Sequence, residues 1–112
     1  MIIKYVKDGS KTIGVLVGAK SKVNEFNIGY SAVKPKSKDV FDKKFGLDIA
    51  YKRAVINCDR VKSSSTLYFP EQLKEEYKKF YKRCEKYFKN HKPSEKVTAY
   101  NYLILRDNNN ID

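Results

Sequence analysis

Apolar side chains recur along residues 70 to 90 at intervals of four, three, four and three residues. The residues on this stripe are Leu73, Tyr77, Phe80, Cys84 and Tyr87. Because an α-helix turns once in about 3.6 residues, this spacing places all five side chains on one face and predicts an amphipathic helix. An apolar helix face must be buried against another element. The chain is therefore expected to fold with this helix on an apolar surface that other segments build.

Residues 1 to 33 have the composition of β-strands. The runs MIIKYV and TIGVLVGAK flank an Asp-Gly turn signal, which predicts a β-hairpin, and FNIGYSAV supplies a third strand. We expect an antiparallel sheet with one buried side. Candidates for that side are Val6, Ile13, Val15, Val17, Ile28 and Tyr30.

Residues 39 to 55 predict a first helix, with Ser37 or Asp39 placed to cap it. Gly46 costs about 1 kcal/mol in a helix interior unless close packing requires it. The apolar residues fall on two faces, and a helix of this kind is covered on both sides. Either the sheet and the second helix cover it, or another subunit does. One face carries Phe41, Phe45 and Ile49, and the other carries Val40, Leu47, Ala50, Tyr51 and Ala54.

The C-terminal segment VTAYNYLILRD, residues 97 to 107, is rich in β-branched and aromatic residues and predicts a last strand. Residues 108 to 112 predict a disordered tail, which leaves residues 1 to 107 as a single domain of common size. The expected fold class is α+β, with a small antiparallel sheet of three or four strands packed on two α-helices.

GVLVGAKS, residues 14 to 21, resembles a phosphate-binding loop but lacks the spacing of glycines and lysine that such a loop needs. Such a loop needs four residues between its glycines and a lysine directly after the second glycine, whereas three residues separate Gly14 from Gly18, and Ala19 precedes Lys20. No amphipathic helix follows it either, so the segment is interpreted as a plain strand. Lys20 is expected only at the rim of any phosphate site.

The formal net charge of +11 permits two interpretations. Long-range attraction favours an anionic partner. However, only four of the 24 Lys and Arg residues are arginine, and the chain is rich in Asn, Tyr and Ile, which an AT-rich genome also produces. The arginines carry more information, because guanidinium stacks on aromatic rings and binds phosphates with two hydrogen bonds.

The sequence offers little for catalysis. His91 is the single histidine, and no cysteine or carboxylate stands near it at a metal-ligand or triad spacing. Cys58 and Cys84 lack such spacing as well and are expected to be reduced thiols. Acids at Asp39 and Asp42 are explained by helix capping. We expect no enzyme, no cofactor and no metal, and a cytosolic chain without a membrane span or secretory signal.

Nine tyrosines and six phenylalanines could stack on nucleotide bases, each for about 1–3 kcal/mol, although aromatics at helical spacing are usually core residues. A resemblance to a known family favours base stacking over a core role for one of these rings. IGYSAVKPKSKDVFDKKFGLDIAYKRA, residues 28 to 54, resembles the Thoeris anti-defence sponge proteins of phages. The matching features are the Ile-Gly-aromatic-Ser strand end, a proline, and the run from Asp39 to Ala54.

The resemblance implies a protein that binds a cyclic ADP-ribose isomer made by a host TIR enzyme, such as glyco-cyclic ADP-ribose, without cleaving it. It implies a homodimer or a hexamer in the cytoplasm of the infected bacterial host, with ligand pockets at the subunit contact. Some members of the family also bind cyclic oligonucleotides. By the same resemblance, Phe80 stacks on the adenine, Asn90 reads the adenine edge, and Arg53 and Arg106 meet the pyrophosphate or the other face of the base.

Two other functions remain open from the residues. A small basic phage protein of this composition could bind RNA or DNA through its lysines and tyrosines. It could also be a protein inhibitor that covers a host enzyme. Affinity for oligonucleotides that falls steeply with salt indicates the first alternative. A stoichiometric host partner indicates the second.

Overall fold

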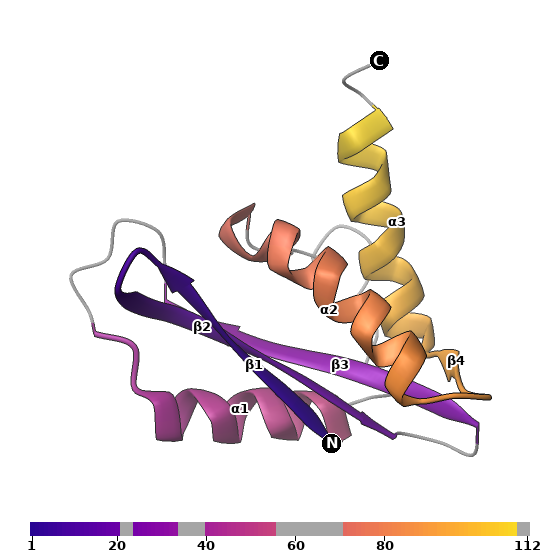
Figure 1. The fold of residues 1–112 in the computed structure, drawn as a ribbon, viewed down its shortest axis with the longest axis horizontal. Helices are drawn as coiled ribbons and strands as arrows, with labels where there is room; N and C mark the ends of the chain where they lie inside the picture. Colours follow the sequence, from indigo (N-terminus) through magenta and orange to yellow (C-terminus); the bar gives the residue numbers. More distant parts are fainter. Residues whose placement is uncertain (21–23, 34–39, 56–70, 110–112) are drawn as a thin grey trace.

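The computed structural model describes residues 1–20, 24–33, 40–55 and 71–109, and Figure 1 shows their arrangement. Residues 56 to 70 with Cys58, the cap candidates Ser37 and Asp39, and the last three residues of the predicted tail lie outside the described residues. The elements are β1 (Ile2–Asp8), β2 (Lys11–Lys20), β3 (Glu25–Ala32), α1 (Lys43–Val55), the 3-10 turn η1 (Glu71–Leu73), α2 (Lys74–Tyr87), β4 (Lys92–Pro93) and α3 (Glu95–Asn109). The α+β class is confirmed.

The strands form one sheet in the order β1-β2-β3-β4. The three predicted strands are present and pair antiparallel, with Val15 opposite both Tyr5 and Ser31. The sheet is nevertheless mixed, because the two-residue strand β4 runs parallel to β3 and places Lys92 opposite Glu25. This fourth strand follows α2 directly, so the end of α2 is held against the sheet.

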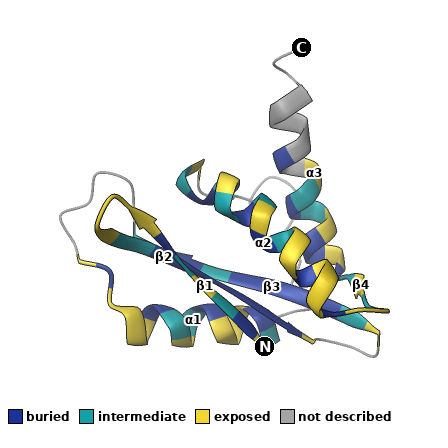
Figure 2. Ribbon diagram, viewed as in Figure 1, coloured by how far each residue is buried: buried dark blue, intermediate teal, exposed yellow. Residues whose placement is uncertain are grey.

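Both faces of the sheet are covered, by α1 on one side and by α2 and α3 on the other (Figures 1 and 2). Side chains of β2 alternate between the two cores: Val15 and Val17 pack with α1, whereas Leu16 packs under α2. The prediction of a single buried side was therefore wrong. Val6 and Ile28 belong to the α2 face, and Val15 and Val17 belong to the α1 face.

Helix α1 lies very close to β3. A Cβ added to Gly29 would meet backbone atoms of Ala50 and Ala54, and one added to Gly46 would meet the ring of Phe41. Close packing therefore explains the glycine inside this helix. The second predicted helix does not cover α1, since it lies on the opposite face of the sheet, and Phe45 remains 65% exposed.

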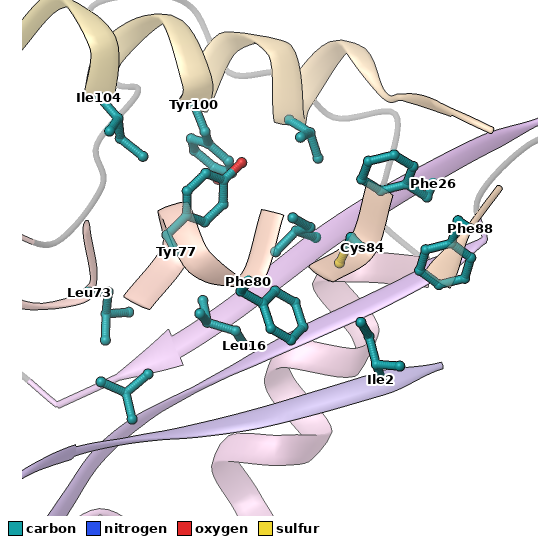
Figure 3. Close-up of a cluster of buried hydrophobic side chains, with 13 residues drawn as sticks. Ile2, Leu16, Phe26, Leu73, Tyr77, Phe80, Cys84, Phe88, Tyr100 and Ile104 are labelled. Atoms are coloured by element: carbon teal, nitrogen blue, oxygen red, sulfur yellow. The ribbon is translucent and has the colours of Figure 1, made fainter. Parts of the chain in front are cut away.

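The amphipathic helix predicted from residues 70 to 90 is confirmed as α2. Leu73, Tyr77, Phe80 and Cys84 of its stripe are buried in the cluster that Figure 3 shows, whereas Tyr87 is 57% exposed. The stripe leaves the core at Tyr87, and the next residue, Phe88, is buried in the cluster instead. Tyr87 is the last residue of the helix.

The prediction of a strand at residues 97 to 107 was wrong, because this segment lies in helix α3. Ser94 caps the helix: its Oγ accepts the backbone N–H of Val97 at 3.2 Å. Val97, Tyr100 and Ile104 recur at helical spacing and are buried in one cluster with residues of α2, and Figure 3 shows Tyr100 and Ile104 there. Burial of this face outweighs the local preference of β-branched and aromatic residues for strands. The helix continues to Asn109, so it includes the first two residues of the predicted tail.

Candidate functional site

A cavity of about 370 Å³ opens where the end of β2 meets the C-terminal end of α2. We call it the basic cavity. Its lining consists of Lys20, Lys86, Tyr87, Phe88, Lys89 and His91. Lys20 is the last residue of β2, and the other five residues form the end of α2 and the turn that leads to β4. The cavity thus depends on contact between two segments that are far apart in the sequence.

Backbone hydrogen bonds fix the turn below the cavity. The N–H of Phe88 donates to Cys84 O at 2.8 Å, and the N–H of His91 donates to Phe88 O at 3.1 Å. Asn90 has a φ of 66°, a left-handed conformation that asparagine adopts more readily than most residues. The N–H of Lys92 then donates to Asn24 O at 2.8 Å. These bonds hold the turn against the start of β3.

Tyr87 presents an aromatic surface with a rigid support. Phe88 is buried and stacks on Phe26, with ring centroids 5.6 Å apart and planes inclined by 11°. The ring of Tyr87 stands edge-on to Phe88, with centroids 4.8 Å apart at 86°. Because Phe88 fixes one edge of this ring, an arriving planar group finds the tyrosine already oriented.

Of the residues that the structure describes, the lining includes three lysines and no Asp or Glu. The end of a helix carries a partial negative charge of about half an electron, which is smaller than the positive charge of three lysines. The cavity therefore attracts anions. Nucleotides, nucleotide pyrophosphates and nucleic acids are biological anions in which phosphate groups stand next to a planar base.

Phe80 does not present a ring face to a ligand in this structure. It is 3% exposed, lies in the core between α2 and the sheet, and comes within 3.4 Å of the place where a Cβ on Gly18 would stand. Its position on the apolar stripe explains this burial. The exposed ring near Asn90 is instead that of Tyr87, which the sequence assigned to the core.

The other predicted ligand residues lie apart from one another. Asn90 is exposed between two residues of the cavity lining, Lys89 and His91. Arg53 lies in the last turn of α1, on the other face of the sheet, and its Nη1 donates to Tyr30 O at 2.9 Å. The backbone of residue 106 belongs to α3, and the side chain of Arg106 lies outside what the structure describes.

Sequence reasoning therefore missed most of the cavity. Lys20 was expected at the rim of a site, and the structure places it in the lining, as the end of a strand and not as part of a phosphate loop. For His91 the sequence predicted only that it lacks a metal-ligand or triad partner, whereas the structure places it in the lining. The signal available in the sequence was KYFKNH, residues 86 to 91, where cations alternate with aromatic rings at a helix end.

A group of buried polar side chains, Asn27, Ser94 and Lys96, connects three elements. Asn27 donates from Nδ2 to Ala54 O at 3.0 Å and accepts from Ser94 Oγ at 2.7 Å. Lys96 Nζ donates to Arg53 O at 3.1 Å. These bonds join β3, the end of α1 and the start of α3. Because these bonds join secondary-structure elements to one another, we assign this group a structural role.

Within the described parts of the chain, no three His, Cys, Asp or Glu side chains are grouped so that they could hold a metal ion. None of the helices in those parts is both long and apolar enough to cross a membrane. A scan against protein-family models found no match, and neither did searches of curated proteins and of solved structures.

Proposed function

We propose that this protein binds a small phosphate-containing nucleotide in the basic cavity and holds it without chemical change. Following the resemblance of residues 28 to 54, the proposed ligand is a cyclic ADP-ribose isomer made by a host TIR enzyme, captured by a phage protein in the cytoplasm of the infected bacterium. The observation that carries the proposal is the meeting of three lysines and the exposed ring of Tyr87 around one cavity.

The size and chemistry of the cavity support a ligand of this class. Small-molecule sites in proteins commonly measure about 300–1,000 Å³, and the cavity lies at the lower end of this range at about 370 Å³. An aromatic ring beneath a base contributes about 1–3 kcal/mol. Lysines act as point charges on a phosphate and impose little geometry, so they suit a compact cyclic pyrophosphate as well as an extended one.

Sequestration also agrees with the groups in the lining. Among the described residues, the lining offers His91 neither a carboxylate nor a thiol as a partner, and the Nδ1 atom of its ring contacts Lys89 O at 2.9 Å. A triad requires the histidine to lie between a nucleophile and an orienting acid. The proposal therefore includes binding and slow release but no bond cleavage.

The proposal includes a homodimer or hexamer, as the resemblance implies. Helix α1 and the residues just before it carry exposed apolar side chains that such a contact would cover: Val40, Phe45 and Tyr51 are 83%, 65% and 40% exposed. Arg53 follows on the same helix. In this arrangement a neighbouring subunit would bring Arg53 toward a ligand, which one chain alone does not do.

The test is a binding measurement on a matched pair of tyrosine variants. Tyr87→Ala should weaken binding of ADP-ribose, measured by calorimetry, by about 5- to 150-fold, which corresponds to the loss of one stacked base. Tyr102→Ala is the control, because Tyr102 is 66% exposed on α3 and does not line the cavity. Equal affinities for the two variants would refute the site.

The same lysines suit the phosphates of a nucleic acid, so RNA or DNA binding is the second candidate. For an oligonucleotide the logarithm of affinity should fall steeply and linearly with the logarithm of salt concentration. Heating protein that has been incubated with extract of TIR-activated cells, followed by mass spectrometry, should release an intact cyclic nucleotide. Recovery of oligonucleotides alone would favour the second candidate.

A further inference from the structure

Among the described strands, β1 pairs with β2 alone and so forms one edge of the sheet. A hydrogen bond on the far side of β2 shows which way its backbone groups point. The N–H of Val33, just after β3, donates to Ile13 O at 3.1 Å. The C=O of Ile13 and the N–H of Gly14 belong to one planar trans peptide and point in opposite directions, so Gly14 faces β1. Leu16, two residues further along, faces β1 as well.

The register of the β1–β2 pair then gives the direction of the backbone groups in β1. Lys4 lies opposite Leu16 and Val6 lies opposite Gly14, so both residues bond to β2. The alternate residues Ile3 and Tyr5 direct their N–H and C=O groups away from the sheet. In the part of the chain that the structure describes, no strand pairs with them there. The outer edge of β1 therefore offers the backbone groups of Ile3 and Tyr5 to a further strand.

The side chains beside this edge differ between the two faces of the sheet. Ile3 and Tyr5 lie on the α1 face, where they are half-buried against the core. Lys4 is exposed on the α2 face, between the buried residues Ile2 and Val6. A strand added at this edge would meet Ile3 and Tyr5 on one face and the ammonium group of Lys4 on the other.

The charge around the edge is positive. Lys4 and Lys7 are exposed, and neither forms an ion pair with a described residue. Lys43 Nζ lies 5.6 Å from the centre of the Tyr5 ring and brings another ammonium group to the α1 face. Asp8, next to the turn, is the single acid of β1. Acidic side chains on an arriving strand would therefore be attracted to this edge.

The same lysine disfavours a second copy of this chain as the occupant. Two antiparallel copies of β1 use all of the outward groups only when Ile3 of one copy pairs with Tyr5 of the other. In that register the two copies of Lys4 stand directly opposite each other, and like charges so placed destabilise a pair of strands. Lysines and bulges are common devices against self-pairing of edge strands, and β1 has a bulge between Val6 and Lys7. A foreign strand with an acid opposite Lys4 avoids the repulsion.

We propose that the outer edge of β1 binds an extended acidic segment of another protein, which adds to the sheet as a further strand. Its backbone pairs with Ile3 and Tyr5, an acidic side chain lies opposite Lys4, and apolar side chains lie on the α1 face. The inference does not depend on the proposed nucleotide site, because the described lining of the basic cavity includes no residue of β1.

Amide hydrogen exchange of single residues, followed by NMR, tests this edge directly. The probe is an acetylated and amidated peptide of about seven residues in which valine and glutamate alternate, and the control peptide has lysine in place of glutamate. In the free protein the outward amides of Ile3 and Tyr5 should exchange faster than the inward amide of Lys4. The glutamate peptide at about ten times its dissociation constant should slow both outward amides about tenfold, because they exchange only while the edge is free.

A matched pair of charge reversals identifies the contact. Lys4→Glu should weaken binding of the glutamate peptide by about 5- to 30-fold and should prefer the lysine peptide, because an attractive pair becomes a repulsive one. Lys82→Glu makes the same change at an exposed position of α2 and should bind both peptides as the unmodified protein does.

Three results would overturn the inference while leaving the proposed nucleotide site intact. The first is that the glutamate peptide does not bind, or binds without slowing exchange at Ile3 and Tyr5. The second is that Lys4→Glu and Lys82→Glu bind this peptide equally well. The third is slow exchange of the two amides in the free protein, which would show that the edge is already covered. If that protection grew with protein concentration, the occupant would be a second copy.

Discussion

Replacing Gly18 with alanine tests how closely α2 lies on the sheet. The added Cβ would stand 2.7 Å from Cys84 Sγ, 3.3 Å from Ile2 Cγ1 and 3.4 Å from Phe80 Cε2. Optimal contacts between carbon atoms are about 3.5–4.0 Å, so the sulfur would overlap the new methyl group by roughly 1 Å. Overpacking of this kind costs about 1–3 kcal/mol. The reduced entropy of the unfolded chain offsets part of that cost, by about 0.4–1 kcal/mol.

The cause can be isolated by combining this change with Cys84→Ala. That substitution alone removes the buried sulfur and leaves a small void, for which we expect a loss of about 1–2 kcal/mol. In the double variant the methyl group on residue 18 occupies the space that the sulfur leaves, so its free energy of unfolding should exceed the additive value by about 1–2 kcal/mol. Urea unfolding of all four proteins, with unchanged m values, measures this coupling. Additivity within about 0.5 kcal/mol would show that the two positions do not touch, and the reasoning would fail.

Three further predictions concern the rest of the fold. Gly29→Ala should cost about 3 kcal/mol, because its Cβ would meet backbone atoms of Ala54 that cannot rotate away; an unchanged melting temperature would contradict the close approach of α1. Ser94→Ala should cost about 1–2 kcal/mol in urea unfolding, since it removes the cap of α3 and the bond to Asn27, whereas Ser94→Asp should keep the cap. Burial raises the pKa of Cys84 to about 12, so this thiol ionises first in the unfolded state, and stability should fall as pH rises above about 9, by up to about 1.4 kcal/mol per unit. The unfolding midpoints of the wild type and of Cys84→Ala should diverge between about pH 8 and 10. Midpoints that change in parallel with pH would contradict the raised pKa of Cys84.

Local sequence patterns predicted those elements in which the spacing of apolar residues matches the face that is buried. The alternation in residues 1 to 33 and the four-three spacing of α2 arise because one face of each element meets the core. They did not predict which face of the sheet each helix covers, because β2 is apolar on both sides and its alternation does not say which partner lies where. That choice depends on contacts such as Gly29 with α1 and Gly18 with α2.

Helix α3 shows where local preference misleads. Its β-branched and aromatic residues favour a strand, yet Val97, Tyr100 and Ile104 also satisfy a helical period, and Ser94 with Glu95 has the form of a helix start. Burial under α2 decides in favour of the helix. Phe80 is a different case: this ring, chosen by resemblance, lies on the stripe that packing requires, and the structure buries it.

The positions of the lysines indicate an anionic ligand more strongly than the net charge does. Elsewhere on the surface, lysines pair with acids one turn away: Lys52 lies 3.0 Å from Asp48, and such exposed pairs contribute little to stability. At the basic cavity the fold instead brings Lys20 from β2 into one lining with Lys86 and Lys89, and no acid lines it in the part of the chain that the structure describes. Like charges gathered in this way repel one another in the empty protein, and the arrangement becomes favourable once an anion neutralises them. A composition bias would add lysines at random positions, but it does not explain why three of them share one cavity with an exposed aromatic ring.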